Sequence, residues 1–349
     1  MSSPALPVED RADERSLEEL GALLETAGGV SAGVTLQKRE KPDPGTFIGT
    51  GKVEELAEIL KANECSLALF DNALSPAQQR NLEDALGVRV MDRAGIILDI
   101  FAKRAQTKEG RLQVELAQYE YLLPRLTRMW THLVRQTASG ASRIGTRGPG
   151  ETQLETDRRH IRDKITRLRG ELDKVRSVRA TQRRLRGKNE VKTVALVGYT
   201  NAGKSTLLNK LTGAGIQAKN RLFDTLDTTT RRLRLPDGRE VLLSDTVGFI
   251  RKLPHQLVAA FKATLEELTF TDLILHIVDV SNEDWEHQAE VCEKLINELG
   301  ASGTPQILVY NKCDAAPENV TSGGSESVNI SAKTGEGLDA LLTKIAETI

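Results

Sequence analysis

The 349-residue sequence is poor in cysteine, in aromatic side chains and in long apolar stretches. Its three cysteines, Cys65, Cys292 and Cys313, lie far apart without a Cys-x-x-Cys pair, which argues against a disulfide scaffold and a zinc site. No apolar run of about 18 residues occurs, so no membrane-spanning helix is expected. Residues 1–13 lack the basic start and apolar core of a secretory signal. These absences favour a cytoplasmic protein, which we expect to be monomeric when free.

Charge is segregated along the chain, although the net charge is only −1. Residues 1–30 carry seven acidic residues against two arginines, whereas residues 157–188 carry thirteen Lys/Arg against four Asp/Glu. A basic surplus of this kind attracts phosphate-rich RNA, and the binding depends on salt. Because few aromatic side chains can stack on bases, we expect recognition of the RNA backbone and shape.

The N-terminal third predicts a small α/β subdomain. Residues 1–29 are acidic and polar and are predicted to form a weakly ordered extension. Residues 30–105 alternate short apolar runs with helical patterns, which is typical of a mostly parallel α/β unit. Ser75 and Pro76 supply a helix cap and a proline in the first helical turn. The predicted helices and strands are, in chain order, residues 53–60, 66–70, 78–86 and 88–90.

Residues 106–188 carry two heptad patterns, which predict an antiparallel helical hairpin. Pro124 lies inside the first pattern and should interrupt that helix. A glycine-rich, basic segment at 136–150 separates the patterns and is predicted to be the exposed tip. The apolar positions are Leu112, Leu116, Tyr119, Leu123, Leu126, Trp130 and Leu133, then Ile161, Ile165, Leu168, Leu172 and Val175.

Residues 189–349 predict a doubly wound α/β domain, in which buried strands alternate with helices. Residues 236–238, Pro-Asp-Gly, are flanked by two strand patterns and predict a hairpin turn. The predicted strands are residues 192–197, 231–235, 239–243, 273–280 and 306–310. The predicted helices are residues 204–211, 255–268, 286–299 and 338–345.

A phosphate-binding loop follows the first of these strands. The pattern G-x-x-x-x-G-K-[ST] is matched by Gly198-Tyr199-Thr200-Asn201-Ala202-Gly203-Lys204-Ser205. The motif opens the predicted helix 204–211, of which Thr206 is the third residue. Its backbone N–H groups and the helix N-terminus attract phosphate oxygens. Lys204 can reach the β- and γ-phosphates, and Ser205 can offer its hydroxyl to Mg²⁺. The loop therefore predicts a nucleoside triphosphate site, without deciding between ATP and GTP.

Two later motifs select guanine. Asn311-Lys312-Cys313-Asp314 follows a strand, and the Asp314 carboxylate can accept from N1–H and the exocyclic amine of guanine, a donor pair that adenine lacks. Ser331-Ala332-Lys333 ends a later strand, where a backbone N–H can meet the guanine O6. An ATPase, the alternative, would bind ATP more tightly than GTP.

Two segments between these motifs predict the switch elements. Asp245-Thr246-Val247-Gly248 places Asp245 to hold Mg²⁺ through water and the Gly248 N–H to face the γ-phosphate. Phe223-Asp224-Thr225-Leu226-Asp227, with the threonines that follow it, should supply one more hydroxyl to Mg²⁺. Such a segment becomes ordered with the γ-phosphate and is released on hydrolysis.

These motifs resemble those of the HflX family of ribosome-associated GTPases, in the TRAFAC class. Four other stretches carry the resemblance, which covers residues 30–349: GTGKVEEL (49–56), FDNALSPAQ (70–78), RLQVELA (111–117) and GPGETQLE (148–155). The resemblance favours Thr225 over Thr229 as the switch ligand of Mg²⁺, which makes Lys204, Thr225 and Gly248 the expected catalytic groups. It also implies GTP-dependent binding to the ribosome, mainly to the rRNA of its large subunit, in subunit splitting, rescue or biogenesis.

Position 249 is unusual for hydrolysis. Ras-like GTPases place a glutamine after the glycine of Asp-x-x-Gly to orient the attacking water, and Phe249 occupies that position here. We therefore expect slow hydrolysis without a partner; the alternative is that another residue or a backbone group takes the place of the glutamine. The alternative to a ribosomal GTPase is a GTP-gated switch whose hairpin docks another protein; nucleotide-dependent sedimentation with ribosomes separates the two.

Overall fold

The computed structural model describes residues 8–126, 149–186, 191–213, 222–223, 229–253, 266–316 and 327–349. The chain divides into two compact units, one formed by Met1–Ala102 with Leu112–Leu172 and the other by Lys103–Arg111 with Asp173–Ile349. Within the described residues, no helix is both long and apolar enough to cross a bilayer.

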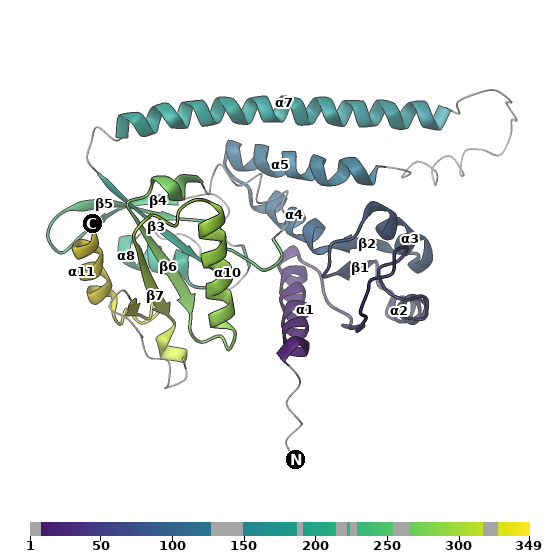
Figure 1. Cartoon of the computed structure of the whole chain (residues 1–349), viewed down its shortest axis with the longest axis horizontal. Coiled ribbons are helices and arrows are strands. Elements are labelled where there is room, and N and C mark those ends of the chain that lie inside the picture. Colours follow the sequence, from purple (N-terminus) through teal and green to yellow (C-terminus); the bar gives the residue numbers. More distant parts are fainter. Residues whose placement is uncertain are drawn as a thin grey trace, which may run out of the picture. The chain divides into compact units, whose positions relative to one another are not determined.

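The N-terminal elements form the predicted small parallel α/β fold (Figure 1). Strand β1 pairs in parallel with β2, with Leu67 opposite Arg89 and Phe70 opposite Asp92. Leu82 and Val90 belong to a buried apolar cluster against this sheet. The bounds are α1 (Val8–Ala27), α2 (Thr50–Ala62), β1 (Leu67–Phe70), α3 (Pro76–Leu86), β2 (Arg89–Asp92) and α4 (Arg93–Arg104).

Helix α3 begins with the predicted cap. The Ser75 hydroxyl accepts a hydrogen bond from the Gln78 backbone N–H, and the Gln78 side chain accepts one from the Ser75 backbone N–H. This reciprocal pair satisfies two N–H groups at the helix start, and Pro76 has no N–H to satisfy. At the other end, Gly87 adopts a φ of 68°, the left-handed conformation that glycine tolerates best.

Residues 8–27 form helix α1, so the prediction of a weakly ordered extension was wrong there. The leucines of this segment lie on one helical face, and Leu20 and Leu23 are buried. Polar contacts fix the same helix: Ser16 Oγ donates to Asp71 Oδ2 at 2.7 Å, and Glu19 forms an ion pair with Arg93. An acidic segment is thus ordered because one of its acids has a buried cationic partner.

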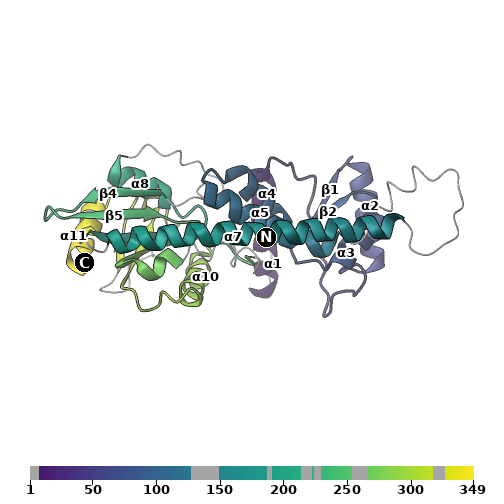
Figure 2. The same cartoon turned by 90° about the horizontal axis from the view of Figure 1, so that it is seen from above.

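The helical hairpin is confirmed by α5 (Lys108–Leu122) and α7 (Pro149–Arg186). As predicted, α5 stops before Pro124, and a 3₁₀ turn, η1 (Leu123–Arg125), follows. In the first unit the two helices run side by side in opposite directions (Figures 1 and 2), and Lys164 Nζ donates to the Tyr119 hydroxyl at 2.9 Å. Ile165 and Leu168 of the second heptad pattern are buried. The predicted tip and the end of the first pattern lie outside the described residues.

The second unit contains a six-stranded sheet in the order β4-β5-β3-β6-β7-β8. All neighbouring strands are parallel except β4 and β5, which form the predicted hairpin around Gly238. The strands are β3 (Lys192–Gly198), β4 (Thr229–Arg234), β5 (Glu240–Asp245), β6 (Leu273–Asp279), β7 (Gln306–Asn311) and β8 (Ser327–Asn329).

Helices cover both faces of this sheet, as expected of a doubly wound fold, with α8 and α10 on opposite faces (Figure 2). Side chains of α8 and α11 share one buried cluster with the sheet. The predicted helix at 255–268 falls largely outside the described residues. The bounds are α8 (Lys204–Thr212), η2 (Glu266–Phe270), α10 (Trp285–Glu298), η3 (Cys313–Ala315) and α11 (Leu338–Thr348). Because β3, β5, β6 and β7 are parallel, their carboxyl ends meet at one edge of the sheet, where ligands of such folds bind.

Candidate nucleotide-binding site

The predicted phosphate-binding loop lies between β3 and α8, at this carboxyl edge. Gly203 has a φ of 96°, and a Cβ atom there would lie 2.2 Å from Asn311 Nδ2. A Cβ atom at Gly198 would lie 2.3 Å from the carbonyl oxygen of Ile277. The two glycines of the motif are therefore required by backbone conformation and by close packing.

Lys204 is held inside the loop. Its Nζ atom donates to the carbonyl oxygens of Gly198 at 3.0 Å and Tyr199 at 2.8 Å. Burial lowers the pKa of the Lys204 ammonium, and the neighbouring Asp245 carboxylate opposes that shift. The ammonium thus lies in a desolvated position, where an added phosphate would favour its charged form.

Ser205 and Asp245 bring two oxygen ligands together. Ser205 Oγ donates to Asp245 Oδ2 at 2.6 Å, and the Asp245 side chain is fully buried at the end of β5. A hydroxyl and a carboxylate beside a phosphate loop are the donor chemistry that Mg²⁺ prefers. The residues present therefore fit a magnesium ion.

The Asp245–Gly248 loop is packed directly on the phosphate loop. Thr246 Oγ1 donates to the Leu196 carbonyl at 2.7 Å, and the Thr200 N–H donates to the Phe249 carbonyl at 2.7 Å. The Phe249 N–H donates in turn to the Gly198 carbonyl at 3.1 Å. A Cβ atom at Gly248 would lie 2.9 Å from Thr200 Cα and 3.0 Å from Lys204 Nζ, so this glycine is required for the close approach.

Asn311 joins the phosphate loop to the predicted base loop. Its Nδ2 donates to the Ala202 carbonyl at 2.7 Å, and its Oδ1 accepts from the Ala332 N–H at 2.9 Å. Ser331 Oγ donates to Asp314 Oδ1 at 2.7 Å. The two motifs predicted to contact guanine thus lie together and are connected to the motif predicted to bind phosphate.

Lys312 is held by a residue that the sequence reasoning missed. Lys312 has a φ of 65°, and its Nζ forms a 2.6 Å ion pair with Asp279 Oδ2. Asp279 ends β6, and its position at the carboxyl end of a buried strand is the signal that would have found it.

Comparisons with known proteins match three consecutive stretches of the chain. Family models match residues 14–102 (GTP-binding GTPase N-terminal), 104–186 (GTP-binding GTPase Middle Region) and 193–312 (50S ribosome-binding GTPase). GTPase HflX of Caldanaerobacter subterraneus subsp. tengcongensis is 52% identical over 333 residues, covering 95% of this chain and 77% of that protein. GTPase HflX of Escherichia coli (strain K12) is 47% identical over 343 residues, covering 97% of this chain and 80% of that protein.

The chain belongs to the HflX GTPase family. It is accordingly a GTPase that binds guanine nucleotide, and the family resemblance drawn from its motifs is confirmed. A GTP-binding protein from Sulfolobus solfataricus, solved in complex with GDP, shares the fold, with a TM-score of 0.50 and 24% identity over 96% of both chains. The N-terminal family model begins at residue 14, inside α1, which supports counting that helix as part of the folded unit.

Not all predicted site residues of this HflX GTPase are described. Phe223 is buried and has a φ of 55°. Asp224, Thr225, Leu226 and Asp227 lie outside the described residues, so the choice between Thr225 and Thr229 as magnesium ligand stays a prediction. The remaining predicted residues belong to the loops described above. Asn201 and Thr206 are part of the phosphate loop; in sequence, Val247 precedes Gly248, Cys313 precedes Asp314, and Lys333 follows Ala332.

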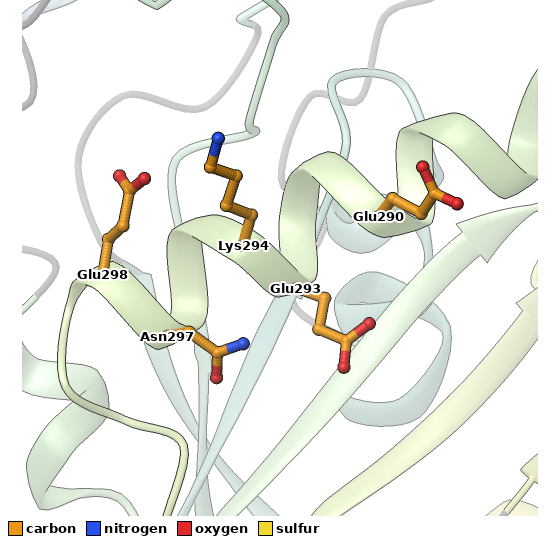
Figure 3. A pocket seen from close by; sticks show the side chains of 5 residues that line it. All are labelled: Glu290, Glu293, Lys294, Asn297 and Glu298. Atoms are coloured by element: carbon orange, nitrogen blue, oxygen red, sulfur yellow. The ribbon is translucent and has the colours of Figure 1, made fainter.

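A surface pocket lies apart from these loops, on α10 (Figure 3). Its lining comes from one helix and is mostly acidic: Glu290, Glu293, Lys294, Asn297 and Glu298. It contains none of the predicted nucleotide ligands, and its acidic character is opposite to what a phosphate needs.

Proposed function

We propose that GTP binds along the four loops described above. The phosphate loop, residues 198–206, surrounds the phosphates, and Lys204 exchanges its two carbonyl partners for phosphate oxygens. Thr200 Oγ1 is buried without a hydrogen-bond partner among the described residues, which suits a hydroxyl close to this polyanion. Asp314 accepts from the guanine edge, and residues 331–333 approach its O6.

Magnesium completes this proposal. Ser205 and Thr225 would hold Mg²⁺ directly, and Asp245 would hold it through water. When bound, Mg²⁺ offsets the negative charge on the β- and γ-phosphates. The Gly248 N–H faces the γ-phosphate, close to the Lys204 ammonium, since a Cβ atom at Gly248 would lie 3.0 Å from Lys204 Nζ.

Hydrolysis in the free protein is proposed to be slow. The Phe249 side chain is buried, and its backbone N–H and carbonyl already bond to Gly198 and Thr200. Neither the side chain nor the backbone of this residue is available to orient an attacking water. In this proposal a partner supplies or reorganises the water-positioning group; the alternative is another residue or backbone group of the protein itself, and unstimulated rates that equal stimulated ones would favour it.

We propose that this partner is the ribosome, through its large subunit. The observation that carries the proposal is the basic, exposed surface of α7. Arg159 and Arg162 are exposed there, and neither forms an ion pair with another described residue. The 50S ribosome-binding GTPase model that matches residues 193–312 agrees with this partner. GTP-dependent binding to that subunit would serve subunit splitting, rescue or biogenesis.

Sedimentation with ribosomes and single-turnover hydrolysis test the proposal together. Large subunits should retain the protein with a non-hydrolysable GTP analogue, should retain it less with GDP, and should accelerate GTP hydrolysis. Arg159→Gln/Arg162→Gln should weaken retention, whereas Lys61→Gln/Lys294→Gln, which removes two exposed charges elsewhere, should not. Retention that ignores the nucleotide, together with unstimulated hydrolysis, would favour a protein-binding switch instead.

A further inference from the structure

The GTPase unit has a basic edge strand of its own. Among the described residues, strand β4 ends the sheet order and pairs only with β5, so no described strand pairs with its other edge. Four arginines lie on this hairpin, at 231, 232, 234 and 239, against two exposed acidic residues, Asp237 and Glu240. An edge strand normally exposes some charge to prevent sheet pairing, and the charged side chains of β4 itself are all arginines.

The side chains of β4 divide between the core and solvent. Leu233 is buried with Val241 and Leu243 in the apolar cluster of the sheet. Because side chains alternate along a strand, Arg232 and Arg234 point to the opposite face, about 7 Å apart. The Arg232 side chain is 80% exposed. The buried leucine fixes the register of the strand, so the arginines have a fixed spacing.

These arginines are poorly compensated by acidic groups. Arg232 meets Glu240 at 3.6 Å, with both side chains well exposed, which is a weak pair. Arg239 is paired with Asp237 at the turn. Arg231 donates only to the backbone carbonyl of Thr230, and within the described part of the chain neither Arg231 nor Arg234 forms an ion pair. Arg231 lies on the face of Leu233, whereas Arg234 shares its face with the weakly paired Arg232, so Arg232 and Arg234 remain available to one external anionic partner.

The chemistry of this face favours RNA over protein. None of the exposed large apolar side chains among the described residues lies within 229–245. Protein interfaces depend on buried apolar and aromatic anchors, which this hairpin does not offer. Arginine forks match the two oxygens of a phosphate, and consecutive phosphates of an RNA strand provide a row of such partners.

The same hairpin is continuous with the nucleotide site. Thr229, the first residue of β4, pairs with Asp245, the last residue of β5. The segment 223–228, predicted to reach the γ-phosphate, enters β4 directly, and the Asp245–Gly248 loop leaves β5. A ligand that holds β4 therefore restrains the ends of both switch elements at once.

We propose that Arg232 and Arg234, which share one face of β4, bind rRNA phosphates, and that this contact accelerates GTP hydrolysis by fixing the ends of the switch segments at Thr229 and Asp245. The inference rests on the proposed ribosome binding and adds to it a second RNA surface, separate from α7. Binding through α7 supplies affinity, whereas binding through β4 supplies the catalytic response.

The double variant Arg232→Gln/Arg234→Gln tests whether β4 supplies the catalytic response while α7 supplies affinity. The variant should bind GDP and hydrolyse GTP alone like the wild type. Large-subunit-stimulated single-turnover hydrolysis should fall about tenfold, because charge-assisted contacts to phosphate are lost. Binding to protein-free large-subunit rRNA should show a salt slope smaller by about 1.5, since each phosphate contact contributes about 0.7 to 0.9. Arg232→Lys/Arg234→Lys should keep that slope, and Lys61→Gln/Lys294→Gln should behave as wild type in all assays.

The outcomes separate this inference from the proposed function. Stimulation of the glutamine variant equal to that of the wild type would overturn the inference and leave ribosome binding intact. Lost stimulation with an unchanged salt slope would also overturn it, because the partner of β4 would then be a protein. A wild-type protein that large subunits neither retain nor stimulate would overturn both.

Discussion

Gly248 is a residue of the site at which a side chain has little room. An added methyl group would lie 2.9 Å from Thr200 Cα and 3.0 Å from Lys204 Nζ, so the loop or the lysine must move. We expect Gly248→Ala to slow single-turnover GTP hydrolysis by about tenfold or more, which is a barrier increase of about 1.4 kcal/mol. GDP affinity, measured by calorimetry, should change much less because GDP has no γ-phosphate. Gly303→Ala is the control, since a Cβ atom there has open space; equal rates in both variants would refute the assignment.

Asp314 tests the choice of base at the same scale. Its carboxylate accepts from Ser331 and is proposed to accept from the guanine edge. Asp314→Asn should weaken GDP and GTP binding by about 2 kcal/mol, roughly thirtyfold, because the guanine donor pair loses its charged acceptor. Calorimetry with GDP measures this directly. Asp339→Asn, which removes an exposed acid on α11, should bind normally, and normal binding by Asp314→Asn would mean that another group selects guanine.

Helix α1 is attached to the first unit partly through a single buried charge. Arg93 is 2% exposed and forms ion pairs with Glu19 of α1 and, at 2.6 Å, with Asp71. Arg93→Ala would remove the buried cation that both carboxylates contact and should cost about 3 to 5 kcal/mol. Denaturant unfolding measures the loss, and hydrogen exchange should show residues 8–27 opening first. Lys52→Ala breaks a partly exposed pair with Glu55 and should cost less than about 1 kcal/mol; equal costs would show that the buried pairs do not hold α1.

The elements also show what the sequence could predict. The strands follow from short apolar runs, and the phosphate loop follows from its glycine-lysine motif. The helical hairpin follows from heptad spacing, and the end of its first helix follows from Pro124. The order of α1 does not, because its partners Asp71 and Arg93 are more than 50 residues away in the chain. Asn311 was predicted as a nucleotide ligand, yet its role in joining two loops depends on Ala202, 109 residues earlier. Long-range polar contacts leave no periodic signal, so only the folded chain reveals them.

At the scale of the whole molecule, each unit has a hydrophobic cluster of its own, and the GTPase unit encloses ionisable groups beneath the site. His276 lies on β6, opposite Val197 of β3, and is buried. Its Nε2 has no hydrogen-bond partner among the described residues. Burial, with the nearby Lys204 ammonium, lowers the pKa of His276 to about 4. Folding thus keeps this imidazole neutral at a pH at which the unfolded chain would protonate it.

The stability of the protein should therefore depend on pH below neutrality. The unfolded chain binds a proton at His276 near pH 6.5, whereas the folded chain binds it only near pH 4. Between these values the unfolded state holds more protons, so the free energy of unfolding falls as the pH falls. The contribution of this group from pH 7 to pH 5 is about 2 kcal/mol.

Denaturant unfolding at both pH values should show that His276→Leu loses less stability than the wild type by this amount. Equal losses in both proteins would place the origin of the acid sensitivity in other groups.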